Sequence, residues 1–240
     1  MKKPLIILAG PTAVGKTALS IRLAKEVNAE IISADSMQVY RHMDIGSAKI
    51  RPEEMDGVPH HLVDVLEPEA DFNVVRFQQM AKAAAEEIWT RGKIPLVVGG
   101  TGFYIQALLY DIDFTENDGD TAYRQEMEQL AKEKGGDYLH TLLETADPQA
   151  ARDIHPNNIK RMIRALEFHR QTGGKISEHN EKERTKESPY NYAYFVLTDE
   201  RSRLYERIDR RVDLMMEEGL PDEVRFLRER GVQRSSTAMQ

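Results

Sequence analysis

The sequence of 240 residues predicts an α/β fold, in which a parallel sheet flanked by helices carries a helical insertion. Three observations support this prediction. Short apolar runs alternate with helical patterns over the first hundred residues, and a glycine-rich loop joins the first run to the first helix. Strand patterns then disappear between about Asp113 and Pro189. Strand–helix alternation of this kind is typical of parallel sheets with helices on both faces.

The predicted strands are short and rich in Ile, Val and Leu, as buried parallel strands are. They are Leu5–Ala9, Glu30–Ala34, Leu62–Val65 and Ile94–Val98, with a further strand at Tyr192–Leu197. Helices are predicted between them at Lys16–Val27, where leucine and valine recur at helical spacing, and at Val74–Thr90, which has an Ala-rich centre. The first hundred residues therefore form strand–helix units.

The middle of the chain predicts helices only. The amphipathic segments are Tyr123–Lys134, Tyr138–Ala146 and Asn157–Thr172, and they are broken by Gly135–Gly136, Asp147–Pro148 and Gly173–Gly174. After the strand at Tyr192, the chain closes with helices near Ser202–Glu218 and Pro221–Arg230. We therefore expect an α/β core at residues 1–113 and 190–240, and a helical insertion at residues 114–189.

Composition excludes several classes of protein. The chain is 40% hydrophobic and 30% charged, which is an ordinary globular balance. It has no cysteine, so disulfides and thiolate metal sites are excluded. The apolar run behind Lys2 and Lys3 is too short for a signal peptide, and no other segment is apolar enough to span a membrane. We expect a cytoplasmic monomer without a membrane partner.

Charge is unevenly distributed along the chain. The formal net charge of −7 argues against a nucleic-acid partner if it is taken as an average. Basic side chains nevertheless gather between Lys160 and Lys186 and again between Arg201 and Arg211. Such clusters are the electrostatic pattern of nucleic-acid binding, although solvated helix faces explain them equally well from charge alone.

A phosphate-binding motif follows the first predicted strand and opens the first predicted helix. Its residues are Gly10, Pro11, Thr12, Ala13, Val14, Gly15, Lys16 and Thr17, which match G-x-x-x-x-G-K-[ST]. In such a P-loop the backbone N–H groups surround phosphate oxygens at the positive end of a helix. Lys16 supplies a positive charge, and the Thr17 hydroxyl can bind Mg²⁺. The motif predicts a P-loop NTPase-like core and a diphosphate ligand, without distinguishing ATP from other diphosphates.

Two further sites lie at predicted strand ends, which face the ligand crevice in open α/β sheets. Asp35, Ser36, Met37 and Gln38 follow the second strand. The Asp35 carboxylate could hold Mg²⁺ through water or accept a proton, or it could simply cap the next helix. Gly99–Tyr104 follows Ile94–Val98 and is either a second anion site or a tight turn without a ligand.

Lys160, Arg161 and Arg164 form a basic cluster at helical spacing within the insertion. Like charges on one helix face repel one another unless an anion or an acidic partner offsets them, and a phosphate backbone would do so. Three of the histidines, His60, His61 and His155, have neither the spacing nor the carboxylate neighbours of a metal site. The cluster therefore predicts an anion or an acidic partner at this helix, and we expect no histidine metal site.

In this order, the motifs resemble the bacterial form of the tRNA dimethylallyltransferase (tRNA isopentenyltransferase) family. The matching segments span nearly the whole chain. They are GPTAVGKT at Gly10–Thr17, ISADSMQVYR at Ile32–Arg41, DIGSAK at Asp44–Lys49, VPHHLVDV at Val58–Val65, VVGGTGFY at Val97–Tyr104, NIKRMIRALE at Asn158–Glu167 and LYERIDRRVDLMMEEGL at Leu204–Leu220. Chains of the family ordinarily continue beyond the position of Gln240, so we expect this sequence to lack helices that flank the active site.

The resemblance implies transfer of a dimethylallyl group from dimethylallyl diphosphate to N6 of the adenosine just 3′ of a tRNA anticodon, with release of pyrophosphate. It implies Asp35 as general base, Gln38 beside the same adenine, and Thr101 and Arg211 on the diphosphate, with Mg²⁺ as cofactor. It further implies contact with the anticodon stem-loop. The residues are Asp35, Ser36, Met37, Gln38, Thr101, Ile159, Lys160, Arg161, Met162, Ile163 and Arg164.

Three alternative functions share the P-loop. A small-molecule kinase would use the helical insertion as a lid over ATP, with arginines on the transferred phosphoryl group. An adenylate dimethylallyltransferase would need no basic insertion for tRNA. A nucleotide switch or RNA-binding protein without catalysis is a third class, although the guanine-specifying pattern N-K-x-D is absent.

Overall fold

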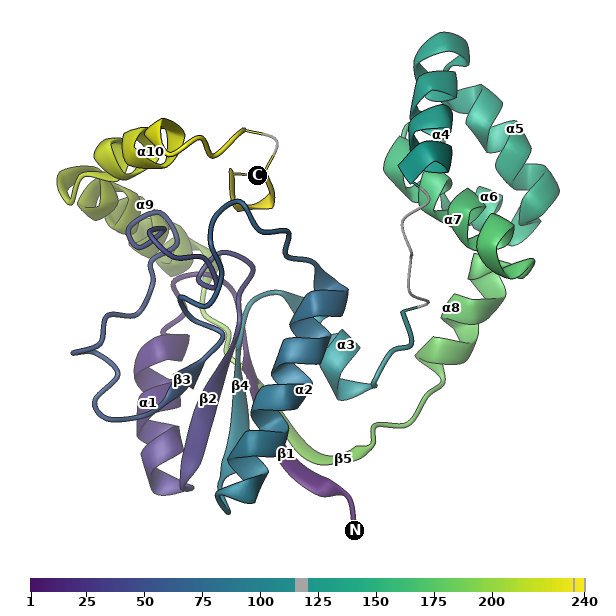
Figure 1. Cartoon of the computed structure of the whole chain (residues 1–240). Helices are drawn as coiled ribbons and strands as arrows, with labels where there is room; N and C mark the ends of the chain where they lie inside the picture. The colour runs from purple at the N-terminus through teal and green to yellow at the C-terminus, as the bar shows by residue number, and fades with distance from the viewer. Residues whose placement is uncertain (115–120, 235, 240) are drawn as a thin grey trace. The chain divides into compact units, whose positions relative to one another are not determined.

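The computed structural model describes residues 1–114, 121–234 and 236–239 (Figure 1). Contacts divide the chain into two compact units, one formed by Met1–Asp111 with Ser188–Gln240 and the other by Ile112–Glu187. Each unit has its own hydrophobic core. Within the described residues, no helix combines the length and the apolar character that crossing a lipid bilayer requires.

The first unit is built on a five-stranded sheet in the order β3-β2-β4-β1-β5. The strands are β1 (Lys3–Ala9), β2 (Ala29–Ala34), β3 (His60–His61), β4 (Ile94–Gly99) and β5 (Tyr190–Val196). All four strand pairs are parallel. The parallel α/β sheet predicted from the sequence is therefore confirmed.

Helices cover both faces of this sheet. They are α1 (Lys16–Glu26) on one face, and α2 (Val74–Thr90) and α3 (Gly102–Leu109) on the other. After β5 come α9 (Arg201–Glu217) and α10 (Leu220–Glu229), which contact each other, and then a 3₁₀ turn at Thr237–Met239. Ile7 and Val97 belong to the core beneath α2 and α3, whereas their neighbours Leu8 and Leu96 belong to the core beneath α1. Successive strand residues point to opposite faces, so continuous apolar runs are what a sheet covered on both sides needs.

The predicted strand Leu62–Val65 is wrong. Only His60–His61 pairs with β2, and the chain then leaves the sheet. Leu62 and Asp64 have φ angles of 63° and 55°, and this left-handed conformation cannot continue an extended strand. The apolar pattern has another cause, because Leu62 and Leu66 both reach the core from irregular backbone.

The second unit contains five helices within the described residues. They are α4 (Thr121–Lys134), α5 (Gly136–Ala146), α6 (Pro148–Asp153), α7 (Ile159–Thr172) and α8 (Ile176–Arg184). Leu139 and Leu143 of α5 pack with Met162 and Leu166 of α7 to form the centre of its core. Residues 115–120 of the expected insertion lie outside the described residues.

The short helix α6 begins where the sequence predicts a break. Proline is favoured in the first turn of a helix, and the Asp147 side chain caps α6 by accepting the Ala150 N–H at 3.0 Å. Asp147 also accepts the backbone N–H and the hydroxyl of Ser177, at 2.9 and 2.7 Å, which joins α6 to α8. The dipeptide Asp147–Pro148 therefore ends one helix and starts the next.

Candidate active site

The P-loop connects β1 to α1 and bends sharply at both ends. Gly10 and Gly15 have φ angles of 154° and 95°. A Cβ atom on Gly10 would lie 2.8 Å from the carbonyl oxygen of Leu197, so only glycine lets the loop pass beside the end of β5. The Lys16 ammonium donates to the carbonyl oxygens of Gly10 and Pro11, both at 2.8 Å, and so lies across the loop.

Three charged groups from different elements act on one another at this loop. Burial lowers the pKa of Lys16, and the positive charge of Arg211 in α9 lowers it further, whereas the carboxylate of Asp35 opposes the shift. Arg211 is half-buried. The structure therefore brings together the P-loop lysine, the aspartate after β2 and the arginine of α9, which the sequence separates by 19 to 195 residues (16 to 35; 16 to 211).

Asp35 shapes the loop that follows β2. Its Oδ1 accepts the backbone N–H groups of Met37 at 2.8 Å and Gln38 at 3.2 Å, which is an Asx turn. No helix follows, so the helix-capping alternative for Asp35 is wrong. Within the described residues Oδ2 accepts no hydrogen bond, so one oxygen organises the loop and the other is available to a ligand.

Gln38 is oriented from both ends of its side-chain amide. Its Oε1 accepts the Ser33 hydroxyl at 3.4 Å, and its Nε2 lies 3.4 and 3.3 Å from the carbonyl oxygens of Ser47 and Ala48. These are long hydrogen bonds, and together they fix the plane of the amide. One oxygen lone pair remains for a ligand, and one N–H remains where the two carbonyl oxygens share a single donor.

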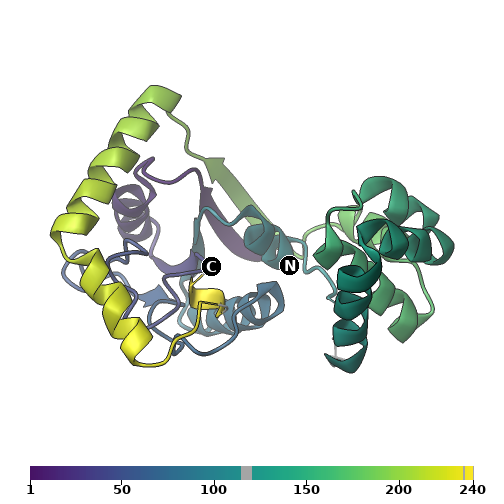
Figure 2. The same cartoon turned by 90° about the horizontal axis from the view of Figure 1, so that it is seen from above.

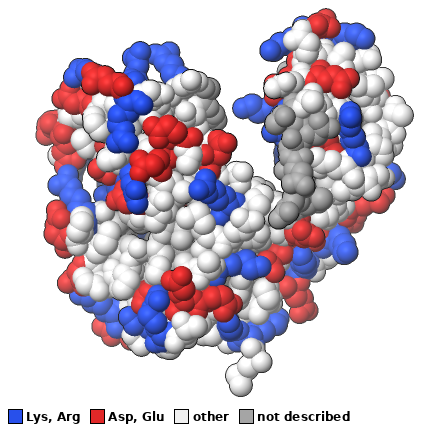
Figure 3. Space-filling view, viewed as in Figure 1, with Lys and Arg blue, Asp and Glu red and all other residues white. Residues whose placement is uncertain are grey.

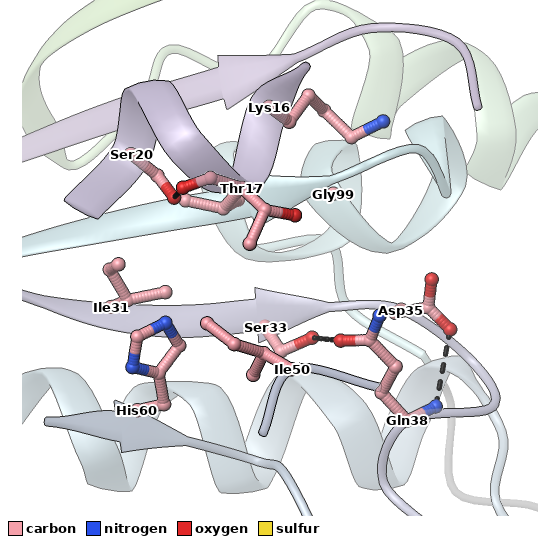
Figure 4. A pocket seen from close by; sticks show the side chains of 11 residues that line it. Lys16, Thr17, Ser20, Ile31, Ser33, Asp35, Gln38, Ile50, His60 and Gly99 are labelled. Carbon is pink, nitrogen blue, oxygen red and sulfur yellow. Dashed lines mark hydrogen bonds between the residues drawn. The ribbon is translucent and has the colours of Figure 1, made fainter. Parts of the chain in front are cut away.

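These side chains line one small cavity of about 60 Å³ that opens to solvent. Lys16 and Thr17 form one wall, and Asp35 and Gln38 come from the loop that follows the strand opposite, β2 (Figure 4). The full lining is Lys16, Thr17, Ser20, Ile31, Ser33, Asp35, Gln38, Ile50, His60, Val98 and Gly99. A phosphate-binding loop therefore adjoins a carboxylate and an amide within a single cavity.

His60 is a cavity residue to which the sequence analysis gave no role. Its Nδ1 lies 2.8 Å from the Val58 carbonyl oxygen. Burial and the neighbouring His61 lower the pKa of His60 although the Val58 carbonyl opposes this, so the imidazole is neutral near pH 7. The only feature of the sequence that could have pointed to His60 is its place in the VPHHLVDV segment.

Among the described residues there is no cluster of three or more His, Cys, Asp or Glu that could hold a metal.

The second glycine-rich turn lies between β4 and α3. A Cβ atom on Gly99 would be 2.2 Å from the Ala34 carbonyl oxygen, so glycine permits the close approach of β4 to β2 at the cavity. Thr101 occupies the N-cap position of α3, but its side chain makes no capping hydrogen bond. Its hydroxyl and the helix N-terminus are therefore available to an anion.

Arg207 of α9 contacts the P-loop directly. Its Nη1 donates to the carbonyl oxygen of Ala13 at 3.3 Å, and its Nη2 pairs with Asp199 at 2.9 Å. The sequence analysis counted Arg207 among the basic residues without assigning it a role. The signal was its spacing from Arg211, because residues four apart share a helix face. Figure 2 shows α9 and α10 running in succession along one side of the first unit.

The family follows from comparison with known proteins. A family model described as IPP transferase matches residues 38–240, and one described as isopentenyl transferase matches residues 3–64. The tRNA dimethylallyltransferase of Lachnoclostridium phytofermentans is 63% identical over 238 residues, which are 99% of this chain and 76% of the relative. The chain belongs to the IPP transferase family. It is a prenyltransferase, and the resemblance inferred from its motifs is confirmed.

Other relatives and solved structures agree. The tRNA dimethylallyltransferase of Bacillus subtilis is 53% identical over 96% of this chain and 73% of its own length. The crystal structure of a tRNA isopentenylpyrophosphate transferase from Bacillus halodurans matches with a TM-score of 0.69 and 48% identity, covering all of this chain and 74% of that one. A eukaryotic dimethylallyltransferase acting on tRNA matches with a TM-score of 0.83, 33% identity and coverage of 98% and 58%.

The basic cluster of this IPP transferase lies in α7 of the second unit, where the residues differ in exposure. Lys160 and Arg161 are exposed. Met162 and Ile163 are 0% and 3% exposed and belong to the core of this unit. Ile159 is partly buried against the same core. The expectation that all six residues from Ile159 to Arg164 contact tRNA stays a prediction, and the exposed side chains of Lys160 and Arg161 are the most accessible of the six.

Arg164 is half-buried, and its Nη1 is fully buried without a hydrogen-bond partner among the described residues. Burial lowers the pKa of Arg164; the adjacent Arg124 acts in the same direction and Glu167 opposes them. Arg124 itself forms two hydrogen bonds to Glu167, at 2.8 and 2.7 Å, and so takes the carboxylate. A buried guanidinium N–H without an acceptor is costly, and an anion arriving at this surface would reduce that cost.

Proposed function

We propose that the chain transfers a dimethylallyl group from dimethylallyl diphosphate to N6 of the adenosine just 3′ of a tRNA anticodon, releasing pyrophosphate. The observation that carries this proposal is the single cavity in which the P-loop adjoins Asp35 and Gln38. A small-molecule kinase would also use a carboxylate such as Asp35, whereas an amide beside that carboxylate suits the edge of an adenine acceptor. The relatives named tRNA dimethylallyltransferase support the same assignment.

The P-loop holds the diphosphate of the donor. Its N–H groups and Lys16 bind the phosphate oxygens, with Thr101 and Arg211 as further ligands. Negative charge grows on the pyrophosphate as the allylic C–O bond breaks, and cations placed in advance around it stabilise that charge. Arg207 supports the loop through Ala13.

Mg²⁺ fits this site as an ion that the protein and the diphosphate would bind together. The described residues offer no cluster of three acidic or histidine ligands, and Mg²⁺ bound to phosphates needs only one or two protein ligands. Thr17 lines the cavity beside Lys16 and would supply a hydroxyl, with Asp35 on the opposite wall. When bound, the ion offsets charge on the leaving group.

Asp35 and Gln38 serve the acceptor adenosine. The adenine leaves its stack to reach the cavity, and Gln38 binds its edge through the paired donor and acceptor of the amide. The N6 lone pair forms a C–N bond to the allylic carbon, the C–O bond breaks, and the electron pair of that bond leaves with pyrophosphate. The free Oδ2 of Asp35 takes the N6 proton, so neutral amine and charged carboxylate become substituted amine and carboxylic acid.

The unit Ile112–Glu187 serves as the tRNA-binding insertion and contacts the anticodon stem-loop. Lys160 and Arg161 are exposed near the start of α7, where the N-terminal helix dipole also favours phosphate. Figure 3 shows Lys and Arg interspersed with Asp and Glu, so the net charge of −7 describes no single face. Phosphate contacts of this kind position RNA without reading its sequence.

A transfer assay tests the proposal. The chain is incubated with Mg²⁺, labelled dimethylallyl diphosphate and unmodified tRNA carrying adenosine 3′ of the anticodon. The matched control is the same tRNA with guanosine at that position, and free AMP is a second acceptor. Label in the adenosine tRNA alone is the expected result. Label in AMP would make the chain an adenylate dimethylallyltransferase, and ATP consumption without any transfer would support the kinase.

A further inference from the structure

The turn of residues 44–49 lies directly behind Gln38, and a distant helix holds it. The Glu223 carboxylate of α10 accepts the backbone N–H groups of Asp44 and Ile45 at 2.7 Å each, and that of Gly46 at 2.9 Å. Three consecutive N–H groups that converge on one point form a concave anion site, here filled by a side chain of the same unit. Hydrogen bonds to a charged acceptor are stronger than neutral ones.

The turn depends on such external contacts. Ala48 has a φ of 47°, a left-handed conformation that costs free energy for a residue with a Cβ. From inside, the Lys49 side chain is 3% exposed and donates to the Tyr40 carbonyl oxygen at 2.6 Å and to Asp44 and Asp64 at 2.6 and 2.5 Å. Lys49 therefore fixes one side of the turn and Glu223 the other.

The turn of residues 44–49 orients the side-chain amide of Gln38, which is the group proposed to bind the adenine. The carbonyl oxygens of Ser47 and Ala48, which follow the three N–H groups bound by Glu223, are the acceptors for Gln38 Nε2. These contacts are 3.4 and 3.3 Å long, so a small shift of the turn would break them. A continuous series of contacts thus leads from α10 through the turn to Gln38.

We propose that Glu223 is a positioning residue for adenine recognition, acting through the turn of residues 44–49 on Gln38. This inference rests on the proposed function, since it needs Gln38 to contact the acceptor base. Glu223 touches neither substrate. Its loss should therefore weaken the use of tRNA and leave the KM for the diphosphate donor nearly unchanged, because among the described residues the hydrogen bonds of the P-loop do not involve this turn.

The test is a double-mutant cycle between Glu223→Gln and Gln38→Ala in the full chain, read as transfer kinetics. Gln keeps the shape of the side chain but places an amide N–H against backbone N–H groups. Asp222→Asn is the matched control, because Asp222 is also a carboxylate in the first turn of α10 and, among the described residues, its ion pair is with Arg225. Glu223→Asp replaces Glu223→Gln in the cycle if the latter does not unfold cooperatively.

The expected result is a fall of about tenfold in kcat/KM for tRNA in Glu223→Gln, mainly through KM, with the donor KM changed less than about twofold. In the Gln38→Ala background the same change should have almost no effect, because the group through which it acts is gone. Asp222→Asn should behave as the unchanged chain.

The positioning role would be overturned if Glu223→Gln lowered kcat/KM for tRNA equally in the unchanged chain and in Gln38→Ala. An equal rise in the KM values of both substrates would also overturn it, and either outcome would leave the proposed function standing. A Gln38→Ala variant with normal kcat/KM for tRNA would refute the base contact and the positioning role together. Failure of the unchanged chain to transfer label at all would instead refute the proposed function itself.

Discussion

Replacing Asp35 by Asn separates the two tasks of this residue. Oδ1 accepts the Met37 and Gln38 N–H groups at 2.8 and 3.2 Å, while Oδ2 has no partner within the described residues. An asparagine in the same rotamer keeps the Oδ1 acceptor and puts an NH₂ group where the proton acceptor was. The loop should therefore stay in place while the base is lost.

The size of the effect follows from these contacts. Loss of a general base lowers kcat by roughly 10²–10⁴-fold, which is the expected range for Asp35→Asn. Asp35→Ala also removes two hydrogen bonds worth about 1 kcal/mol each, so it should add about 2 kcal/mol of loop destabilisation. The alanine variant alone should raise the KM for tRNA, because Gln38 lies within that loop.

Single-turnover transfer with saturating donor measures the chemical step, and filter binding measures tRNA affinity. Asp35→Asn should lose turnover while its affinity for tRNA changes less than about threefold, near 0.65 kcal/mol. If Asp35→Asn retains full single-turnover rate, Asp35 is not the proton acceptor. If it loses affinity as strongly as Asp35→Ala, the charge rather than the turn organises the loop.

Three further predictions concern other parts of the chain. Reversing Lys160 and Arg161 to Glu should weaken binding to all tRNAs and reduce the slope of log K against log salt by about 1.8, as loss of two phosphate contacts requires; unchanged affinity in a salt titration would refute tRNA contact by these two residues. Hydrogen bonds from Arg91 and other basic groups lower the pKa of Glu30 to about 2 although its burial opposes this. A lowered folded pKa contributes stability above the unfolded value of 4.5, up to about 3 kcal/mol, and this is lost as the pH falls toward 2; urea unfolding of Glu30→Gln should lack that pH dependence. Gly99→Ala would put a Cβ 2.2 Å from the Ala34 carbonyl oxygen, so the urea midpoint of unfolding should fall by the equivalent of about 2 kcal/mol or more. An unchanged midpoint would show that β4 and β2 can move apart at this point without loss of stability.

Local periodicity predicted the long elements well, because a long amphipathic pattern has few alternative structures. The helix Val74–Thr90 has the bounds expected from the sequence, and the predicted strands other than Leu62–Val65 coincide with β1, β2, β4 and β5 to within a few residues. The prediction failed where elements are short. At six residues α6 is too short to show a helical repeat, and α8 has a single buried residue, the charged Glu183.

The sequence by itself determined the P-loop, since its glycines, Lys16 and Thr17 are neighbours in the chain and their spacing alone builds a phosphate site. It also placed Asp35 and Thr101 at strand ends, which a parallel sheet necessarily brings to one edge. Only the tertiary structure decided what surrounds them. Arg207 meets Ala13, and Glu223 holds the turn behind Gln38, across 194 and 177 to 179 residues of chain. No local pattern encodes contacts at that separation, because they depend on where the folded chain places α9 beside the P-loop and α10 beside the turn of residues 44–49.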